Sequence, residues 1–337
     1  MPTVGIIANP AAGKDIRRLV AHGRFVPNQE KVNILARILA GLNSTGIRRV
    51  VMMPDSALLG RSASERAGGE LCVEFLDMPV FNEERDSSRA AELMAEMGVD
   101  CIITLGGDGT NRAVAKGCGN APLVPVSTGT NNVFPSMVEG TLAGLAAGVV
   151  ASGAVSPAKT IATRKQLEIH VDGKLRDIAL VDVAVSKERF VGARAIWEMS
   201  TIHEIFLAVA EPSSIGLSAL GAQLHPAPLG SDEGVYARFG DGGTVVTAPV
   251  APGIIVPVAV DRWRTIHSGD SLEVSLRPCT VALDGERSFT VQRDQKAHVT
   301  LNSQGPRVVS VEAALREAAL NGVFSSQYPS TDGRQDR

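Results

Sequence analysis

The chain has 337 residues, of which 44% are apolar and 20% are charged, and its net charge is −3. This length exceeds one ordinary domain, and the apolar content supports a buried core. Because Lys and Arg (33) do not outnumber Asp and Glu (36), and only 4% of residues are aromatic, a nucleic-acid partner is not indicated.

The first 155 residues alternate short β-rich runs with helical patterns. Apolar residues at helical spacing predict helices over 28–42 and 87–97. Strands alternating with helices imply a parallel sheet covered on both faces, so we expect a Rossmann-like α/β domain over residues 1–155. Ligands bind such sheets beyond the C-terminal strand ends. Each predicted strand ends at a proline, a glycine pair or a hydroxyl-rich turn: 4–8, 48–53, 71–76, 101–105 and 123–126.

The pattern changes after residue 155. Short β-rich runs separated by Gly, Asp and Pro predict a mostly antiparallel domain, a β-sandwich, over residues 156–324. Helices are expected over 194–210 and 312–320, and residues 325–337 form a polar tail. The predicted strands are 167–171, 178–185, 235–239, 245–248, 254–260, 271–276, 280–283, 289–291, 298–301 and 308–311.

The uncharged stretch 140–158 is rich in Gly and Ala and contains Pro157. This composition favours close packing against a neighbouring element over a membrane span, and no signal peptide is recognised at the N-terminus. The four cysteines form no CxxC pair, so we expect free thiols and a reducing, cytoplasmic compartment. These cysteines are far apart in the sequence: Cys72, Cys101, Cys118 and Cys279.

The strongest motif is GGDGTN at residues 106–111, between a predicted buried strand and a helix. Its three glycines allow close approach of the backbone to a ligand, and N–H groups at a helix N-terminus favour phosphate. Asp108 in their midst repels a plain anion, which favours a Mg²⁺ bridge or a base acting on a hydroxyl. The alternative is an ordinary strand–turn–helix junction. The glycine spacing is not that of the G-x-G-x-x-G dinucleotide motif.

Two further polar turns follow predicted strands of the same sheet, NPAAGK at 9–14 and STGTNN at 127–132. The first is not a Walker A motif, because Ala8 stands where Gly is required and Asp15 replaces the Ser or Thr. Each turn alone is an ordinary loop signal. Three such turns at the C-terminal ends of strands of one sheet together predict a nucleotide pocket.

These three motifs, in this order and at these separations, resemble the NAD kinase/diacylglycerol kinase superfamily. VALDGE at 281–286 resembles the DGE turn that completes the site in that superfamily, and TAPVAP at 247–252 and SALG at 218–221 resemble further segments. The beginning of the chain is also similar to the ATP-NAD kinase-like proteins of the acetoin-catabolism (AcoX) type. The resemblance implies an α/β domain and a β-rich domain with ATP in the cleft between them.

The resemblance also implies roles for individual residues. Asp108 and Glu286 become the catalytic candidates, and Asp284 becomes a candidate metal ligand. The nucleotide-binding candidates lie in the three turns: Asn9, Pro10, Gly13, Gly106, Gly107, Gly109, Thr110, Asn111, Thr128, Gly129, Thr130 and Asn131.

The expected activity is an ATP- and Mg²⁺-dependent kinase that phosphorylates a hydroxyl of a small molecule, with NAD(H) as the family's default acceptor. Residues 210–215 depart from the NAD kinase pattern, because they lack the tyrosine found there. The acceptor therefore stays open between NAD(H) and another alcohol, polyol or lipid. A non-catalytic, nucleotide-binding regulatory protein linked to acetoin catabolism is the remaining alternative. We expect a homo-oligomer, a dimer or a tetramer, since exposed strand edges favour self-association.

Overall fold

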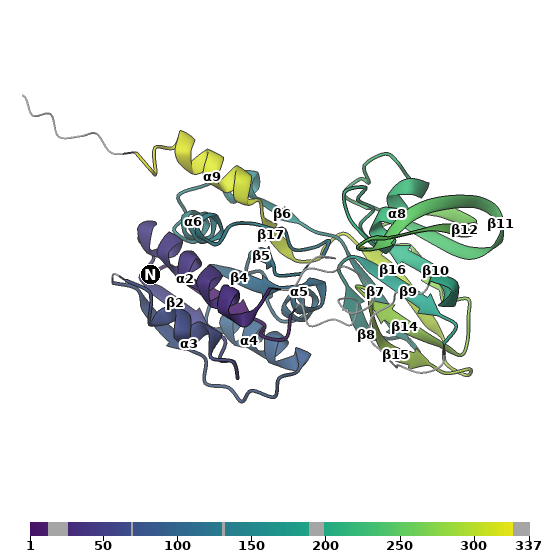
Figure 1. Ribbon diagram of the computed structural model, residues 1–337, viewed down its shortest axis with the longest axis horizontal. Helices are drawn as coiled ribbons and strands as arrows, with labels where there is room; N and C mark the ends of the chain where they lie inside the picture. The colour runs from purple at the N-terminus through teal and green to yellow at the C-terminus, as the bar shows by residue number, and fades with distance from the viewer. Residues whose placement is uncertain (13–25, 69, 130–131, 189–198, 326–337) are drawn as a thin grey trace, which may run out of the picture.

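A seven-stranded sheet organises the first half of the chain in this computed structural model, which describes residues 1–12, 26–68, 70–129, 132–188 and 199–325 (Figure 1). The strand order is β3-β2-β1-β4-β5-β17-β6, and the first five strands of the chain pair in parallel. The strands are β1 Thr3–Ala8, β2 Arg49–Met52, β3 Cys72–Phe75, β4 Cys101–Gly106, β5 Leu123–Ser127, β6 Ile161–Thr163 and β17 Arg307–Val309.

Helices cover both faces of this sheet. On β1, the side chain of Ile6 joins the core under α2, α3, α6 and α9, whereas its neighbour Ile7 joins the core under α4 and α5. Successive residues of a strand point to opposite faces, so strands covered on both sides are apolar throughout. The helices are α2 Asn28–Ser44, α3 Leu59–Ser64, α4 Glu84–Glu96, α5 Asp108–Ala115, α6 Gly140–Ala151, α7 Pro157–Thr160 and α9 Val311–Leu320.

The small residues of α6 allow it to lie very close to α2, as its composition predicts. A Cβ atom at Gly144 would lie 2.2 Å from the carbonyl oxygen of Ile38, and one at Gly140 would lie 2.7 Å from that of Ile34. On α2, a Cβ at Gly41 would lie 2.5 Å from the carbonyl oxygen of Thr141. The two helix backbones are therefore in direct contact, which larger side chains would prevent.

Two antiparallel sheets form most of the second half, on the right of Figure 1. One has the order β12-β11-β10-β9-β14-β15 and the other β13-β16-β7-β8. The predicted combination of an α/β half and a β-rich half is confirmed. The strands are β7 Gln166–Val171, β8 Lys174–Ala179, β9 Asp182–Ser186, β10 Ile202–Leu207, β11 Glu233–Ala251, β12 Ile254–His267, β13 Ser271–Glu273, β14 Cys279–Leu283, β15 Glu286–Val291 and β16 Ala297–Asn302.

Each face of the six-stranded sheet has its own core. Phe206 and Val281 pack toward the four-stranded sheet, and Leu207 and Val235 pack toward the opposite side, where α8 (Leu217–Leu224) lies. The backbone N–H of Gly216, just before α8, donates to the carbonyl of Pro249 on β11 at 2.8 Å. The long β11–β12 hairpin extends past α8 at the right of Figure 1.

The helix predicted over residues 194–210 is wrong where the structure describes it. Residues 202–207 form β10, between β9 and β11, and residues 189–198 lie outside the described chain. β10 is buried on both faces, and its sequence IHEIFL, in which His and Glu interrupt apolar residues, shows no clear alternation. Periodicity alone does not separate such a strand from a buried helix. The single strand predicted over 178–185 is divided into β8 and β9 by a turn at Leu180 and Val181.

Two strands from later in the sequence, β6 and β17, complete the first sheet. β17 pairs in parallel with β5 at Val308↔Leu123 and antiparallel with β6. The strands β6 and β17 and helix α9 thus belong structurally with the first half, although they follow residue 155. Among the described residues, no helix is long and apolar enough to cross a membrane. The four cysteines are free, as expected, and only Cys72 is exposed.

Candidate nucleotide site

The GGDGTN motif forms the junction between β4 and α5. Gly106 ends the strand, Gly107 is the helix N-cap and Asp108 is the first residue of α5. A Cβ at Gly106 would lie 2.6 Å from the side chain of Thr110, so only glycine allows the turn to close this tightly. The first backbone N–H groups of a helix lack intrahelical partners and carry partial positive charge, which favours an anion at this end of α5.

The turn after β1 is joined to the GGDGTN turn by a direct side-chain contact. Asn9 Nδ2 donates to the hydroxyl oxygen of Thr110 at 2.9 Å, and the Asn9 backbone N–H donates to the carbonyl of Leu105 at 3.0 Å. The Asn9 Oδ1 atom accepts from the N–H of Ala11 at 2.8 Å, which shapes the turn as an Asx turn. These contacts bring Asn9, Pro10 and Thr110 to one place.

Lys31, on α2, binds the carbonyl groups of the same turn. Its side chain is fully buried, and Nζ donates to the carbonyl oxygens of Asn9 (3.1 Å), Pro10 (3.0 Å) and Ala12 (2.8 Å). A buried ammonium needs such acceptors to offset its lost hydration. Lys31 is not among the residues predicted from the sequence. The available signal was a lysine four residues before Leu35, on the apolar stripe of a predicted helix.

The Asp108 carboxylate connects α5 to the loop after β5. It accepts from the backbone N–H of Phe134 at 2.8 Å and from that of Val133 at 3.1 Å, and the residue is only 8% exposed. The carboxylate therefore holds the backbone just past STGTNN in place. An acidic residue in the first turn also complements the helix dipole.

Asn132 lies between two of the turns. Its Nδ2 donates to the Ser127 hydroxyl at 2.8 Å, and a Cβ at Gly107 or Gly129 would lie within 3.0 Å of its amide group. The two glycines thus make room for this side chain, which fixes the distance between the second and third turns. Thr128, in the same turn, is buried.

Asn111 supports the motif from within. It is fully buried, its Oδ1 accepts from the Thr104 hydroxyl at 2.6 Å, and its Nδ2 donates to the carbonyl of Gly107 at 2.9 Å. The side chain is used by the protein itself, so Asn111 positions the turn and offers no free group to a ligand.

The DGE segment of the second half reaches this site. Asp284 and Gly285 both have positive φ angles (52° and 78°) and form the two-residue turn of the β14–β15 hairpin, a combination typical of a type I′ turn. The turn places Glu286 beside the first turn of α5. A Cβ at Gly109 would lie 3.8 Å from Glu286 Oε2. Gly109 and Glu286 are thus neighbours across the two halves of the molecule.

Asp284 points away from solvent. Its carboxylate accepts from the N–H groups of Val181 (2.8 Å) and Leu180 (3.0 Å), and it lies 3.9 Å from Arg112 Nε. Burial raises the pKa of this carboxyl group to about 6, against the lowering effects of Arg112 and the backbone N–H donors. These contacts explain the break between β8 and β9, since the turn wraps around the carboxylate.

Helix α5 also carries the ionic contacts between the two halves. Arg112, with 3% of its side chain exposed, pairs with Glu84 of α4 at 2.9 Å and lies beside Asp284. Lys116 pairs with Asp177 of β8 at 2.6 Å. The helix that begins with Asp108 is therefore fixed against the second half along its length.

The described residues do not form a Mg²⁺ site of their own. The carboxylates of Asp108 and Asp284 are taken up by backbone N–H donors, and no cluster of three acidic, His or Cys residues is placed to hold an ion in the described part of the chain. Of the three carboxylates Asp108, Asp284 and Glu286, only Glu286 accepts from no backbone N–H group of the described residues, and it borders Gly109. The contacts of Asp284 are those of a structural residue, and its role as a metal ligand stays a prediction.

The structure brings most of the predicted site residues together, but not all can be placed. Gly13, Thr130 and Asn131 lie outside the described residues. The segments 218–221 and 247–252 pack against each other on α8 and β11, and none of their described contacts joins them to the three turns. Asn132 and Arg112, which the sequence analysis did not select, hold the turns and the two halves in register.

Comparison with known proteins agrees with this architecture. Residues 4–154 match the family model of the ATP-NAD kinase N-terminal domain, and residues 165–304 match that of the acetoin catabolism protein X C-terminal domain. Acetoin catabolism protein X of Cupriavidus necator is 41% identical over 339 residues, covering 96% of this chain and 94% of that protein. The chain belongs to the acetoin catabolism protein X family.

Solved kinase structures are more distant. The yeast NADH kinase complexed with NADH covers 98% of this chain and 90% of its own, at 14% identity and a TM-score of 0.47. An NAD kinase from Archaeoglobus fulgidus in complex with ATP covers 96% and 100%, at 15% identity and a TM-score of 0.38.

Proposed function

We propose that this protein is an ATP-dependent phosphotransferase that transfers the γ-phosphoryl group of ATP to an alcohol. The observation that carries the proposal is the convergence of the polar turns after β1, β4 and β5 at one end of a parallel sheet, where Asn9, Thr110 and Asn132 join them. The match of residues 4–154 to the ATP-NAD kinase domain family supports ATP as the donor.

In this proposal the α5 N-terminus and the glycine backbone bind the phosphates. The N–H groups of Gly107 and Gly109 belong to the N-terminus of α5, where the helix dipole favours negative charge. Beside Gly109, the nearest described atom to a Cβ would be Glu286 Oε2, at 3.8 Å. Asp108 acts indirectly, because its carboxylate holds the loop at 133–134 that forms the wall of the site. Phosphoryl transfer depends mainly on such positioning.

Glu286 is the proposed general base. Its carboxylate borders Gly109, and it reaches the site from the second half of the molecule, opposite the phosphate-binding turn. The acceptor hydroxyl oxygen attacks the γ-phosphorus, the bond from that phosphorus to the β–γ bridging oxygen breaks, and ADP leaves. The hydroxyl proton passes to Glu286.

Mg²⁺ enters the proposal as part of the nucleotide. Mg²⁺ in proteins keeps several waters and is bound through one or two carboxylates together with substrate phosphates. Since the described residues do not form a cage for the ion, no step of the proposal passes through a protein-bound metal. Dependence on Mg²⁺ is tested by assays with and without the ion.

Two kinds of acceptor are proposed, one from the superfamily resemblance and one from the chemistry that the name of the relative indicates. NAD(H) is the default acceptor that the superfamily resemblance implies. The Cupriavidus necator relative is named for acetoin catabolism. Acetoin carries a secondary alcohol, so a small hydroxy compound of this type is the other acceptor that we propose, ahead of a lipid.

A direct assay tests the proposal. Wild-type protein is incubated with ATP, with and without Mg²⁺, and with NAD, NADH, acetoin or butanediol, and ADP release is measured. We expect acceptor-dependent ADP release and, for Glu286→Gln, a kcat lower by about 10²-fold or more with little change in ATP affinity. Glu65→Gln, an exposed residue, is the matched control and should retain full activity.

A regulatory protein without catalysis is the second candidate. It is favoured by the engagement of both Asp108 and Asp284 with backbone N–H groups, which leaves Glu286 as the one candidate base of the three. Binding of ATP without ADP release for every acceptor would support this candidate and contradict the kinase. Self-association and a cytoplasmic location stay predictions, which light scattering and cell fractionation test.

A further inference from the structure

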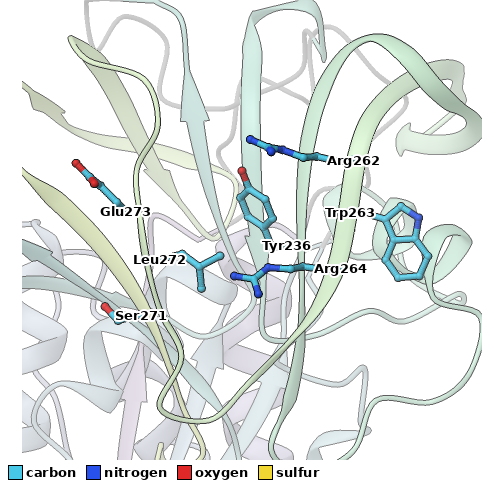
Figure 2. A pocket seen from close by; sticks show the side chains of 7 residues that line it. All are labelled: Tyr236, Arg262, Trp263, Arg264, Ser271, Leu272 and Glu273. Atoms are coloured by element: carbon cyan, nitrogen blue, oxygen red, sulfur yellow. The ribbon is translucent and has the colours of Figure 1, made fainter.

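A pocket lies in the β-rich half, between two strands that are edges of their sheets. It has a volume of ≈ 480 Å³ and lies between β12, an edge of the six-stranded sheet, and β13, an edge of the four-stranded sheet (Figure 2). None of its lining residues belongs to the phosphate-binding turns. The pocket is lined by Tyr236, Arg262, Trp263, Arg264, Ser271, Leu272 and Glu273.

Strand register gathers basic side chains at this pocket. Arg264 is paired with Tyr236 and Arg262 with Arg238 across β11 and β12. Cross-strand partners and residues two apart along a strand share one face of a sheet. Arg262, Arg264 and Tyr236 therefore face the same side, with the Tyr236 ring between the two guanidinium groups in Figure 2.

Two of these arginines, Arg262 and Arg264, have no acidic partner among the described residues. Arg238 pairs with Asp261, and Glu273 on the opposite wall pairs with Arg277 at 2.9 Å. By contrast, Arg262 and Arg264 make no side-chain hydrogen bond and no ion pair with any residue that the structure describes. The pocket therefore carries excess positive charge, and its one acidic lining residue is already paired.

The base of the pocket is rigid. The Tyr236 hydroxyl donates to Oε2 of the fully buried Glu204 at 2.9 Å, and Glu204 also accepts from the backbone N–H (2.7 Å) and the hydroxyl (2.8 Å) of Ser275. Burial, with the nearby Glu204 charge, raises the pKa of Tyr236 to about 12, so the phenol stays neutral. Its proton is committed to Glu204, and the arginines decide the sign of the charge that a ligand meets.

We propose that this pocket binds a small organic anion through Arg262 and Arg264, at a site separate from the nucleotide site. Arginine forks form paired hydrogen bonds to the oxygens of a carboxylate or phosphate group. Leu272 and the Tyr236 ring supply apolar contact for the carbon skeleton, and the volume is within the range of metabolite pockets. The proposal does not depend on the kinase activity proposed above.

Binding measurements on the full chain test this site. Isothermal calorimetry at constant ionic strength uses inorganic phosphate, glycerol 3-phosphate and malate as probes, with glycerol as the neutral comparison. We expect one-to-one binding of glycerol 3-phosphate or malate, none of glycerol, and a loss of affinity of about tenfold or more in Arg262→Gln/Arg264→Gln. Preference for the phosphate ester or for malate identifies the anionic group.

The controls separate specific recognition from net charge. Lys174→Gln/Arg293→Gln removes two exposed positive charges elsewhere in the same half and should leave the affinity unchanged. Arg264→Lys keeps the charge but loses the planar fork, so we expect an intermediate affinity. The proposal is overturned if no anion binds, or if the Arg262→Gln/Arg264→Gln protein, with unchanged melting temperature, binds as tightly as wild type.

Discussion

Asp284 places a carboxyl group with no exposed side-chain surface between backbone N–H donors and the guanidinium of Arg112. Burial, the largest influence, raises the pKa of this group to about 6 in the folded protein, whereas an unfolded Asp titrates near about 3.9. Between these values the folded state binds more protons than the unfolded state. The stabilising contribution is therefore complete below about pH 4 and is lost as the pH rises through 6.

Comparison of wild type with Asp284→Asn isolates this effect. The amide does not titrate, so its structural cost is constant with pH, and we expect its unfolding free energy to rise relative to wild type from pH 4 to pH 7. The full change is up to about 3 kcal/mol, because two pKa units correspond to about 1.36 kcal/mol each. Urea denaturation at several pH values measures it. A difference between the two proteins that does not change with pH would show that Asp284 is ionised throughout.

The contact between α2 and α6 determines the position of one turn of the site, since α2 carries Lys31, which donates to the carbonyls of residues 9, 10 and 12. The close approach of these helices depends on glycines. A side chain would clash most strongly at Gly148 and Gly144. A Cβ there would lie 1.9 Å from Thr45 Oγ1 and 2.2 Å from the Ile38 carbonyl oxygen. Thr45 can change rotamer, but the backbone carbonyl of Ile38 cannot move without displacing α2.

We therefore expect Gly144→Ala to lower the unfolding free energy by about 1–3 kcal/mol, as measured by chemical denaturation. Alanine in a helix interior is intrinsically favoured over glycine by about 1 kcal/mol, so a net loss shows that the steric conflict exceeds this gain. Gly68→Ala is the control, because no atom of the described residues lies within 4 Å of a Cβ there. A Gly144→Ala protein that is as stable as wild type, or more stable, would contradict this expectation, because the steric conflict would then not exceed the intrinsic gain of alanine.

At the scale of the whole molecule, the sequence predicts the parallel sheet well. The strand ends at Ala8, Gly106 and Ser127 coincide with the polar turns, because buried parallel strands are apolar runs that stop where the loop begins. The same property explains the failure at β10. This strand lies in a sheet with both faces covered and has no alternation of apolar and polar residues, so the sequence alone does not distinguish it from a buried helix.

The candidate site was predictable in its motifs but not in its internal contacts. Glycines mark Gly106 and Gly107 as positions of close approach, yet the groups that approach them, Thr110 and Asn132, follow from the three-dimensional path of the chain. Likewise, a buried lysine on α2 and the capture of Asp284 by residues 180–182 depend on pairings between segments far apart in the sequence. No local pattern encodes those pairings.

The central claim is that the N-terminal turn of α5 binds the phosphates of ATP, and Gly109 allows the most direct test. Among the described residues, the nearest atom to a Cβ at Gly109 would be Glu286 Oε2, at 3.8 Å, so Gly109→Ala should fold with an unchanged melting temperature. If the ATP phosphates lie against this backbone, the methyl group occupies their place. Calorimetric titration with ATP should then show tight binding to wild type and a Kd higher by about tenfold or more in Gly109→Ala. Equal ATP affinity of the two proteins, or no binding to wild type, would contradict the account.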